Sequence, residues 1–298
     1  QDIFQPYVLY NQSIENNRLD FIIEKLGCEF VIPFLASTEK TGPDMGYTFI
    51  NTNFEEKLLE INPDIIHFAR SGYYEWPFTK RLSPIQIETN IFGFKDNSPY
   101  LDCSISICET IDKLRGGSDS VIYNPIPKPI GLKENLRNLL NIDENTLVLG
   151  RIGRPSNFTP ISIEASKMLK DTGLKFKYII VGPCNETKNK IKQLHLEDCF
   201  ILYEPTNDDD FIDKFYNTID IFAHYRFDGE CHSTAIAQAM TYGKPVISHF
   251  AGYNGQLETI GDSGFVVNNS MEYFLSILKL TKDKNLYKNL SELSIKNS

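Results

Sequence analysis

The chain has 298 residues, of which 41% are hydrophobic and 23% charged, and its net charge at neutral pH is −9. This composition is typical of a globular protein, and the length allows one large or two ordinary α/β domains. The acidic balance excludes the basic surface that nucleic-acid-binding domains need, so we expect no nucleic-acid partner.

The cysteines and the apolar runs predict that the protein is cytoplasmic. The six cysteines are scattered, with no C-x-x-C pair and no zinc-like spacing to histidines, so we interpret them as free thiols in a reducing cytoplasm. No apolar run approaches the about 20 residues of a membrane helix, and the first residues lack the basic region of a signal peptide. Peripheral membrane contact and the oligomeric state are left open.

The first half of the chain alternates short apolar runs with helical patterns. Helical spacing covers 16–26, which ends at Gly27, and 107–114, which precedes Gly116 and Gly117. The alternation predicts a parallel sheet covered by helices. The expected strands are 7–10, 28–34, 64–68, 85–88, 103–107 and 121–123.

A proline-rich segment marks the expected domain boundary. Three prolines fall within 123–129, where they stiffen the chain and exclude a helix. We therefore predict one domain over 1–125 and a second over 126–298. A short helix over 132–140 is expected to open the second domain.

The second half predicts a doubly wound, Rossmann-like domain. Thr159 and Pro160 are expected to open a helix that ends at Gly173, and 151–155 is expected to be a loop. A further helix is expected over 208–217. The expected strands are 147–150, 176–181, 200–203, 219–223, 246–248 and 265–267.

The acidic residues at the start of that further helix could be mistaken for a metal site. Asp208, Asp209 and Asp210 are consecutive, and Thr206 with Asp209 resembles a capping box. Acidic residues in the first turn of a helix complement its dipole, so we interpret the run as a helix start and expect no metal.

The stretch 225–248 combines turn residues, a short helix and a strand. Glu230 precedes the helix, Ser233 or Thr234 can cap it, and Gly243 can end it. The N-terminus of such a helix is a ready site for a phosphate group, because its first N–H groups are unpaired. Glu230 could accept hydrogen bonds from sugar hydroxyls beside it. Gln238 lies about two helical turns further on.

These residues carry a resemblance to a known family. The pattern Glu230-x7-Gln238-Ala239-Met240-x-x-Gly243-x-Pro245-Val246 resembles the E-x7-E-A-M-x-x-G-x-P-V signature of family-4 retaining glycosyltransferases, with a glutamine in place of the second glutamate. The resemblance implies the α/β GT-B fold, in which two Rossmann-like doubly wound domains face a cleft. The second domain would bind the donor, and the first would lie on the acceptor side.

The resemblance also implies a diphosphate loop. Gly150-Arg151-x-Gly153-Arg154 is similar to the family's G-R-x-x-x-x-K pattern, although no lysine lies between Arg154 and Glu164. We assign Arg154 to the diphosphate first and Arg151 second, because a guanidinium can bind phosphate through two N–H groups. The alternative is that both are surface arginines of a tight loop.

Further donor residues follow from the same resemblance. Glu230 and Arg154 would be catalytic, Gln238 would face the ribose, and the loop 250–258 would offer N–H groups to the donor sugar and phosphate. The remaining expected donor residues are Gly153, Arg151, His232, Ser233, Thr234, Gly252, Tyr253 and Asn254.

The first domain carries a thinner resemblance. Pro63-Asp64-Ile65-x-His67 is similar to the P-D-I-x-H strand of these transferases. It suggests His67, Arg70 and Glu88 as residues on the acceptor or sugar side. A hydrogen-bonded histidine at a strand end and a surface arginine are the alternative interpretation.

The function implied is a retaining, metal-independent transfer of a hexosyl-type unit from a nucleotide-diphospho-sugar, either a UDP- or a GDP-sugar, with no other cofactor. The acceptor would be a hydroxyl of a glycan, lipid or protein, and the leaving phosphate would assist its deprotonation. Two alternatives stay open: a sugar-nucleotide epimerase on the same fold, and a degenerate module that binds a nucleotide sugar without catalysis.

Overall fold

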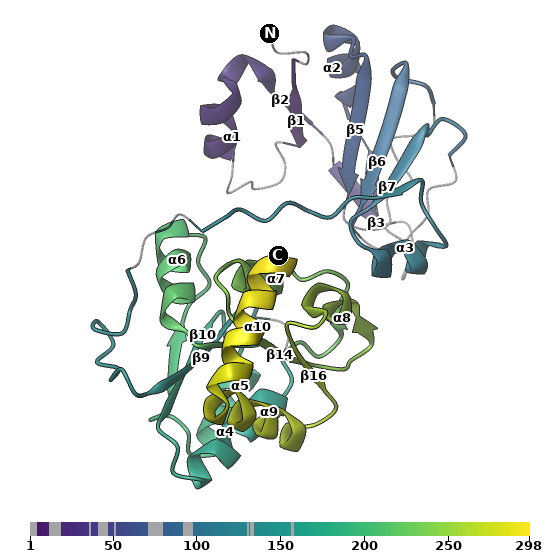
Figure 1. Ribbon diagram of the computed structural model, residues 1–298. Coiled ribbons are helices and arrows are strands. Elements are labelled where there is room, and N and C mark those ends of the chain that lie inside the picture. Colours follow the sequence, from purple (N-terminus) through teal and green to yellow (C-terminus); the bar gives the residue numbers. More distant parts are fainter. Residues whose placement is uncertain are drawn as a thin grey trace. The chain divides into compact units, whose positions relative to one another are not determined.

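The chain divides into two compact units, Gln1–Tyr123 and Asn124–Ser298 (Figure 1). The computed structural model describes residues 5–11, 19–35, 37–40, 47–50, 52–70, 80–91, 98–129, 131, 134–155 and 158–298. Each unit is an α/β structure whose principal sheet is parallel.

The second unit contains a six-stranded sheet in which every strand pair is parallel. From β9 the chain proceeds outward through β10 and β11, returns to the centre at β12, and then proceeds through β14 and β16 on the other side. The strand order therefore reverses between β9 and β12, as in a doubly wound fold. In spatial order the strands are β11 (Phe200–Tyr203), β10 (Phe176–Val181), β9 (Leu147–Ile152), β12 (Ile221–Ala223), β14 (Val246–His249) and β16 (Gly264–Val267).

Helices cover both faces of this sheet. Alternate residues of β10 show this, because Tyr178 and Ile180 belong to one apolar cluster while Ile179 and Val181 belong to the other. The two-sided burial explains why β10 is an apolar run rather than an alternating pattern. The helices are α4 (Ile161–Asp171), α5 (Asn185–Gln193), α6 (Asp209–Thr218), α7 (Thr234–Thr241), α8 (Gly255–Ile260), α9 (Ser270–Lys282) and α10 (Lys284–Asn297).

All six strands expected in this unit form, but several local predictions were wrong. Arg151 and Ile152 continue β9 rather than starting a loop. The stretch predicted as a helix over 132–140 forms hydrogen-bonded turns in its described part, where the Leu140 N–H donates to the Leu136 carbonyl. Helix α4 begins after Pro160 without a side-chain cap, so Thr159 does not cap it.

The cap of α6 also differs from the prediction. The carboxylate of Asp208 accepts from the N–H groups of Asp210 and Phe211, while Thr206 accepts from the Asp208 N–H. Asp208 directly precedes the helix, where its short side chain reaches the second and third N–H groups. Thr206 and Asp209 therefore do not form a capping box, although the acidic run is a helix start as predicted.

The first unit contains a four-stranded parallel sheet and two separate strand pairs among its described residues. Strands β1 and β2 pair in parallel, and β3 and β4 form an antiparallel pair that we did not predict. The first part of the strand predicted over 28–34 is instead a 3-10 turn. The strands are β1 (Val8–Asn11), β2 (Val31–Phe34), β3 (Ser37–Lys40), β4 (Tyr47–Ile50), β5 (Ile65–Arg70), β6 (Ile85–Asn90), β7 (Cys103–Ser106) and β8 (Ser120–Val121).

The helical elements of the first unit are short. They are α1 (Leu19–Leu26), the 3-10 helix η1 (Cys28–Phe30), α2 (Phe54–Ile61) and α3 (Glu109–Arg115). Phe54 and Leu58 of α2 pack with Phe34 and Ile66 in a small apolar core. Across the described parts of both units, no helix is long and apolar enough to span a bilayer.

Candidate active site

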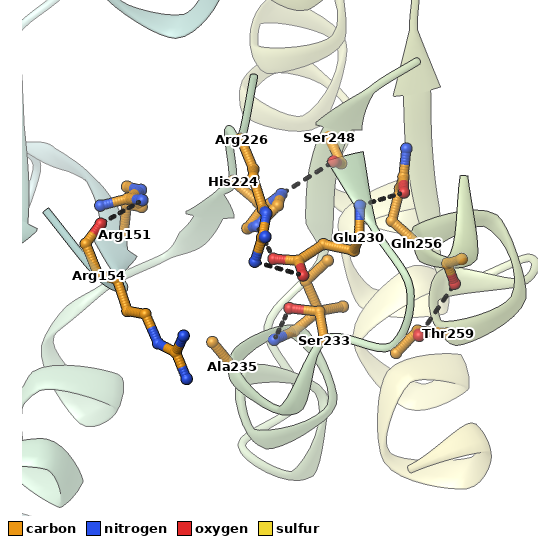
Figure 2. Close-up of polar contacts among 12 residues, drawn as sticks. Arg151, Arg154, His224, Arg226, Glu230, Ser233, Ala235, Ser248, Gln256 and Thr259 are labelled. Carbon is orange, nitrogen blue, oxygen red and sulfur yellow. Dashed lines mark hydrogen bonds and ion pairs between the residues drawn. The ribbon is translucent and has the colours of Figure 1, made fainter. Parts of the chain in front are cut away.

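The chemically interesting side chains gather where the strand order of the second unit reverses. Arg151 lies near the end of β9, and His224 directly follows β12. Loops that leave parallel strands at such a reversal form the usual ligand crevice of open α/β sheets. Figure 2 shows Arg151, His224 and Glu230 in this region.

Glu230 is held through both of its carboxylate oxygens (Figure 2). Its Oε1 lies 3.0 Å from Nε2 of His224, and its Oε2 accepts from Nη1 of Arg226 at 3.3 Å. The Glu230 side chain is 13% exposed. The carboxylate is therefore oriented by two donors while part of it still faces solvent.

His224 is buried and is itself held in place. Its residue is 4% exposed, and Nδ1 lies 3.0 Å from the Ser248 hydroxyl. Burial lowers the pKa of His224 below its ordinary value, although the contact with Glu230 opposes this shift. The neutral ring has one N–H group, and a carboxylate can only accept. We therefore assign the proton to Nε2, which leaves Nδ1 to accept from Ser248.

Arg226 is oriented by a second carboxylate. Its Nε donates to one oxygen of Asp228 at 2.6 Å, and its Nη2 donates to the other at 3.0 Å. The hydrogen bonds from Arg226 lower the pKa of Asp228. This bidentate pair fixes the plane of the guanidinium, so its third nitrogen, Nη1, is directed at Glu230.

A glycine makes the loop that carries Glu230. Gly229 has a φ of +80°, and an added Cβ would lie 1.8 Å from the Tyr253 carbonyl oxygen. The close approach allows β13 (Gly229–Glu230) to pair with β15 (Tyr253–Asn254). The side chain of Gln256 joins the same loops, because it accepts from the Glu230 N–H at 3.3 Å and donates to the His249 carbonyl at 2.8 Å.

The N-terminus of α7 lies after Glu230. Ser233 caps the helix by accepting from the Ile236 N–H at 3.4 Å, which decides between the two expected capping residues. Thr234 is exposed in the first turn, and no acidic side chain occupies that turn. The first N–H groups of a helix have no intrahelical acceptor, so this end can bind an anion.

Arg151 is a buried cation. It is 3% exposed, and its guanidinium carbon lies 4.2 Å from the centroid of the Tyr225 ring. Among the described residues its Nε has no hydrogen-bond partner and no carboxylate forms an ion pair with it. Its Nη2 donates to the Arg154 carbonyl over a long distance of 3.5 Å. A buried charge without a counter-ion favours an anionic ligand.

Arg154 and Gly153 lie in the loop after β9. Arg154 is exposed, and in Figure 2 its guanidinium extends toward the side on which Ala235 of α7 is drawn. The Gly153 N–H donates to the Val181 carbonyl at 3.2 Å, which joins the loop to the neighbouring strand. Within the described part of the chain, the Arg154 side chain makes no ion pair.

The other expected donor residues take varied positions. Gln238 is half-buried in α7, and its side chain has no hydrogen bond to another described residue. His232 is half-buried, and burial lowers its pKa. Tyr253 is exposed beside Gly252, with its N–H donated to the Asp228 carbonyl. The Asn254 amide bonds the backbone of Ala251 through both of its ends, so it shapes the loop.

The first-unit residues have local partners. His67 is exposed on β5, with Nε2 2.7 Å from the Thr89 hydroxyl. Glu88 is fully buried and forms an ion pair with the buried Arg115, so its carboxylate has no surface for an acceptor to contact. Its suggested role in acceptor binding is therefore replaced by a structural one. The side chain of Arg70 lies outside the described residues.

The sequence of the second unit identifies the protein family to which the chain belongs. The model of the family described as "Glycosyl transferases group 1" matches residues 133–297, which is more than half of the chain. The chain belongs to this family. No curated protein matches the chain by sequence.

Solved structures are similar to this glycosyltransferase over nearly its whole length. A glycosyltransferase from Rickettsia africae is 14% identical, with 99% of this chain and 93% of that chain covered and a TM-score of 0.69. HepE from Anabaena, solved with UDP and glucose, is 17% identical, with 97% and 86% covered and a TM-score of 0.70. WaaG, a glycosyltransferase involved in lipopolysaccharide biosynthesis, is 11% identical, with 98% and 94% covered and a TM-score of 0.64. These likenesses confirm the expected GT-B fold.

Sequence reasoning did not select several residues of this candidate site. His224, Arg226, Ser248 and Gln256 all contact Glu230 or the residues that hold it. His224 directly follows the predicted strand 219–223, and that position at a strand's carboxyl end was a usable signal. In the part of the glycosyltransferase that the structure describes, no group of three or more His, Cys, Asp or Glu residues could hold a metal ion.

Proposed function

We propose that this glycosyltransferase moves a glycosyl unit from a UDP- or GDP-sugar to an acceptor hydroxyl, with retention at the anomeric carbon and without a metal ion. One juxtaposition supports the proposal: the buried cation Arg151 and the N-terminus of α7 occupy the strand reversal together with the fixed carboxylate of Glu230. HepE has been solved with UDP-glucose, which is an example of such a donor in a protein of similar fold.

The cationic groups would bind the diphosphate. Arg151 has no carboxylate partner among the described residues, Arg154 is exposed, and the first turn of α7 contains no acidic side chain. Negative charge grows on the diphosphate as the bond to the sugar breaks. Donors that are already oriented stabilise this charge without reorganisation at the moment of reaction.

Glu230 and Gln238 would bind the two sugars of the donor. A carboxylate has about four acceptor positions, and His224 and Arg226 use one on each oxygen of Glu230. The remaining positions can accept from hydroxyls of the transferred sugar. The half-buried Gln238 would bind the ribose through its amide, which lacks the charge of the family's glutamate.

The reaction would take place on one face of the sugar. The bond from the anomeric carbon to the phosphate oxygen breaks, and the acceptor oxygen forms a bond to that carbon from the same side. The proton of the acceptor hydroxyl passes to the leaving phosphate oxygen. Glu230 is engaged through both oxygens, which suits it to orient the sugar rather than to attack it. A hydroxyl of a glycan, lipid or protein would be the acceptor, bound on the side of the first unit.

A ligand panel tests the donor assignment. We would measure thermal shifts with UDP, GDP, ADP and CDP, with and without their common sugars, for the wild type and for the variants E230A and R154A. A ligand at about 100 times its Kd should add about 2.7 kcal/mol of stability. K192A is a matched control, because it removes an exposed positive charge at the far end of α5.

The expected result is a shift with one nucleotide, reduced by R154A, and an additional shift from the sugar, reduced by E230A, while K192A binds like the wild type. No shift with any nucleotide would contradict the proposal. NMR of the first product formed would test retention, because an inverted anomeric configuration excludes the same-face reaction. Binding without turnover over a range of acceptors would favour the degenerate module instead.

A further inference from the structure

We propose that His224 is a positioning residue, which fixes the carboxylate of Glu230 for the donor sugar and is itself fixed by Ser248. The inference rests on the proposed function, because it assigns a partner to the residue expected to bind the transferred sugar. The contacts run from the Ser248 hydroxyl to Nδ1 at 3.0 Å, and from Nε2 to the Glu230 carboxylate at 3.0 Å (Figure 2).

The backbone beneath His224 is rigidly held. Its N–H donates to the Ile247 carbonyl at 2.8 Å, which continues the pairing of β12 with β14. The hydroxyl of Tyr273, from α9, donates to the His224 carbonyl at 3.0 Å. Ser248 lies on β14 and is 1% exposed. The sheet therefore fixes both the histidine and the hydroxyl that orients its ring.

The backbone at Glu230 lies outside the six-stranded sheet, and its N–H donates to the side chain of Gln256 at 3.3 Å. Glu230 lies on the two-residue strand β13, which pairs only with the equally short β15 among the described strands. Two-residue pairings of this kind have little stability of their own. The contact with His224 joins this loop carboxylate to the central sheet. His224 thus holds the Glu230 carboxylate, which would bind the sugar, at a fixed position relative to the sheet.

The contact with Arg226 does not replace this function. Arg226 lies in the same loop as Glu230, and its partner Asp228 lies between the two residues in sequence. The Arg226 N–H donates to Nε2 of His249 on β14 at 3.3 Å, which is a single long contact between this loop and the sheet. The Arg226 side chain itself orients Glu230 only within the loop that they share. Of the described residues that contact the Glu230 carboxylate, His224 is the one whose own N–H pairs with the backbone of a sheet strand.

The variant H224F tests the inference. Phenylalanine fills a similar volume, but it removes the contacts with both Glu230 and Ser248. Kd values would be measured by calorimetry on the full chain for UDP, UDP-glucose, GDP and GDP-mannose, together with kcat for donor turnover. We expect Kd for the nucleotide to stay within about twofold, while the added affinity from the sugar is lost and kcat falls about 100-fold.

Three further variants complete the test. H224Q retains an N–H donor near the former Nε2 and should recover part of the sugar preference and of kcat. S248A leaves the ring in place but removes its orienting partner, so it should show a smaller loss in the same direction. H195N is the control, because His195 is exposed at the opposite end of the sheet, with a φ of 54° that asparagine tolerates.

Each other outcome overturns the inference. An unchanged sugar preference and kcat in H224F would show that His224 does not position Glu230. An equal loss of nucleotide and nucleotide-sugar affinity, together with a lower Tm and no recovery in H224Q, would make the histidine merely structural. If the wild type binds none of the four ligands, the proposed function fails and the inference fails with it.

Discussion

The guanidinium carbon of Arg151 lies 4.2 Å from the centre of the Tyr225 ring, where the cation is covered by an aromatic face rather than by a carboxylate. The Tyr225 hydroxyl lies 3.2 Å from the Thr187 hydroxyl, so α5 contributes to the position of the ring. The contact with the ring offsets part of the cost of burying the charge, and an arriving diphosphate would offset the rest.

From this contact we expect the variant R151M to lose affinity for the nucleotide without losing stability. Methionine removes the buried charge but retains much of the apolar packing, so the Tm without ligand should stay the same or rise. Affinity for the nucleotide should fall at least tenfold, because charge-assisted hydrogen bonds contribute about 1.5–3 kcal/mol. Thermal melts without ligand and calorimetry with UDP and GDP would check this. A lower Tm with normal nucleotide affinity would make Arg151 a structural residue.

Replacing Gln238 with glutamate is expected to raise the affinity for the nucleotide. Q238E should leave the fold intact, because the side chain is half-buried and has no hydrogen bond to another described residue. A carboxylate would bind the ribose hydroxyls about 1 kcal/mol more strongly than the amide does, which is about a fivefold lower Kd. Calorimetry with UDP and with a UDP lacking both ribose hydroxyls would isolate this effect. Equal affinities in Q238E and the wild type would remove Gln238 from the site.

Adding one methyl group at Gly229 is expected to lower both the stability and the donor turnover. In G229A the new Cβ would clash with the Tyr253 carbonyl at a φ of +80°, so β13 could not pair with β15. The strain should cost roughly 1–3 kcal/mol and displace Glu230. Urea unfolding would measure the cost, and donor turnover would fall with it.

The control for that experiment is in the facing loop. The added methyl in G252A would come no closer than 3.3 Å to the Asp228 carbonyl, without a positive φ. Its stability should be close to that of the wild type. Equal losses in G229A and G252A would show that the positive φ of Gly229 is not the source of the cost.

The buried histidines predict that acid destabilises the second unit. Burial lowers the pKa of His224, which faces Glu230 and is influenced by Arg151 and His249, and burial also lowers the pKa of His249. A depressed pKa means that the unfolded chain binds more protons than the folded one. Stability is therefore full above about pH 6.5, the ordinary histidine value, and is lost as the pH falls through the lower pKa of the folded state.

Urea unfolding at several pH values between 7.5 and 5 would measure this slope. Each histidine that stays neutral contributes up to about 1.4 kcal/mol per pH unit, so H224F should have a smaller slope than the wild type. The comparison removes the contribution of carboxylates, which both proteins share. A wild-type stability that rises on acidification, or identical slopes in the two proteins, would contradict the assignment of a neutral His224.

The local elements of the second unit could be predicted from the amino-acid sequence alone. Apolar runs such as 176–181 identified the six strands of the second unit, and their order along the chain predicted the doubly wound sheet. The cap at Ser233 and the positive φ of Gly243 were also readable. These features depend on neighbours in sequence, and side-chain periodicity and capping residues report on those neighbours directly.

The pairing of the charged groups could not be predicted in this way, because it depends on how the strands and helices pack. Glu88 resembled a ligand residue at a strand end, but α3 brings Arg115 to it in the interior. Arg151 resembled a loop residue, but the reversal of strand order places it beneath Tyr225. His224 and Ser248 meet because β12 and β14 are adjacent in the sheet. Strand order and register determine these distances, and both are set by packing of the whole sheet rather than by any local pattern.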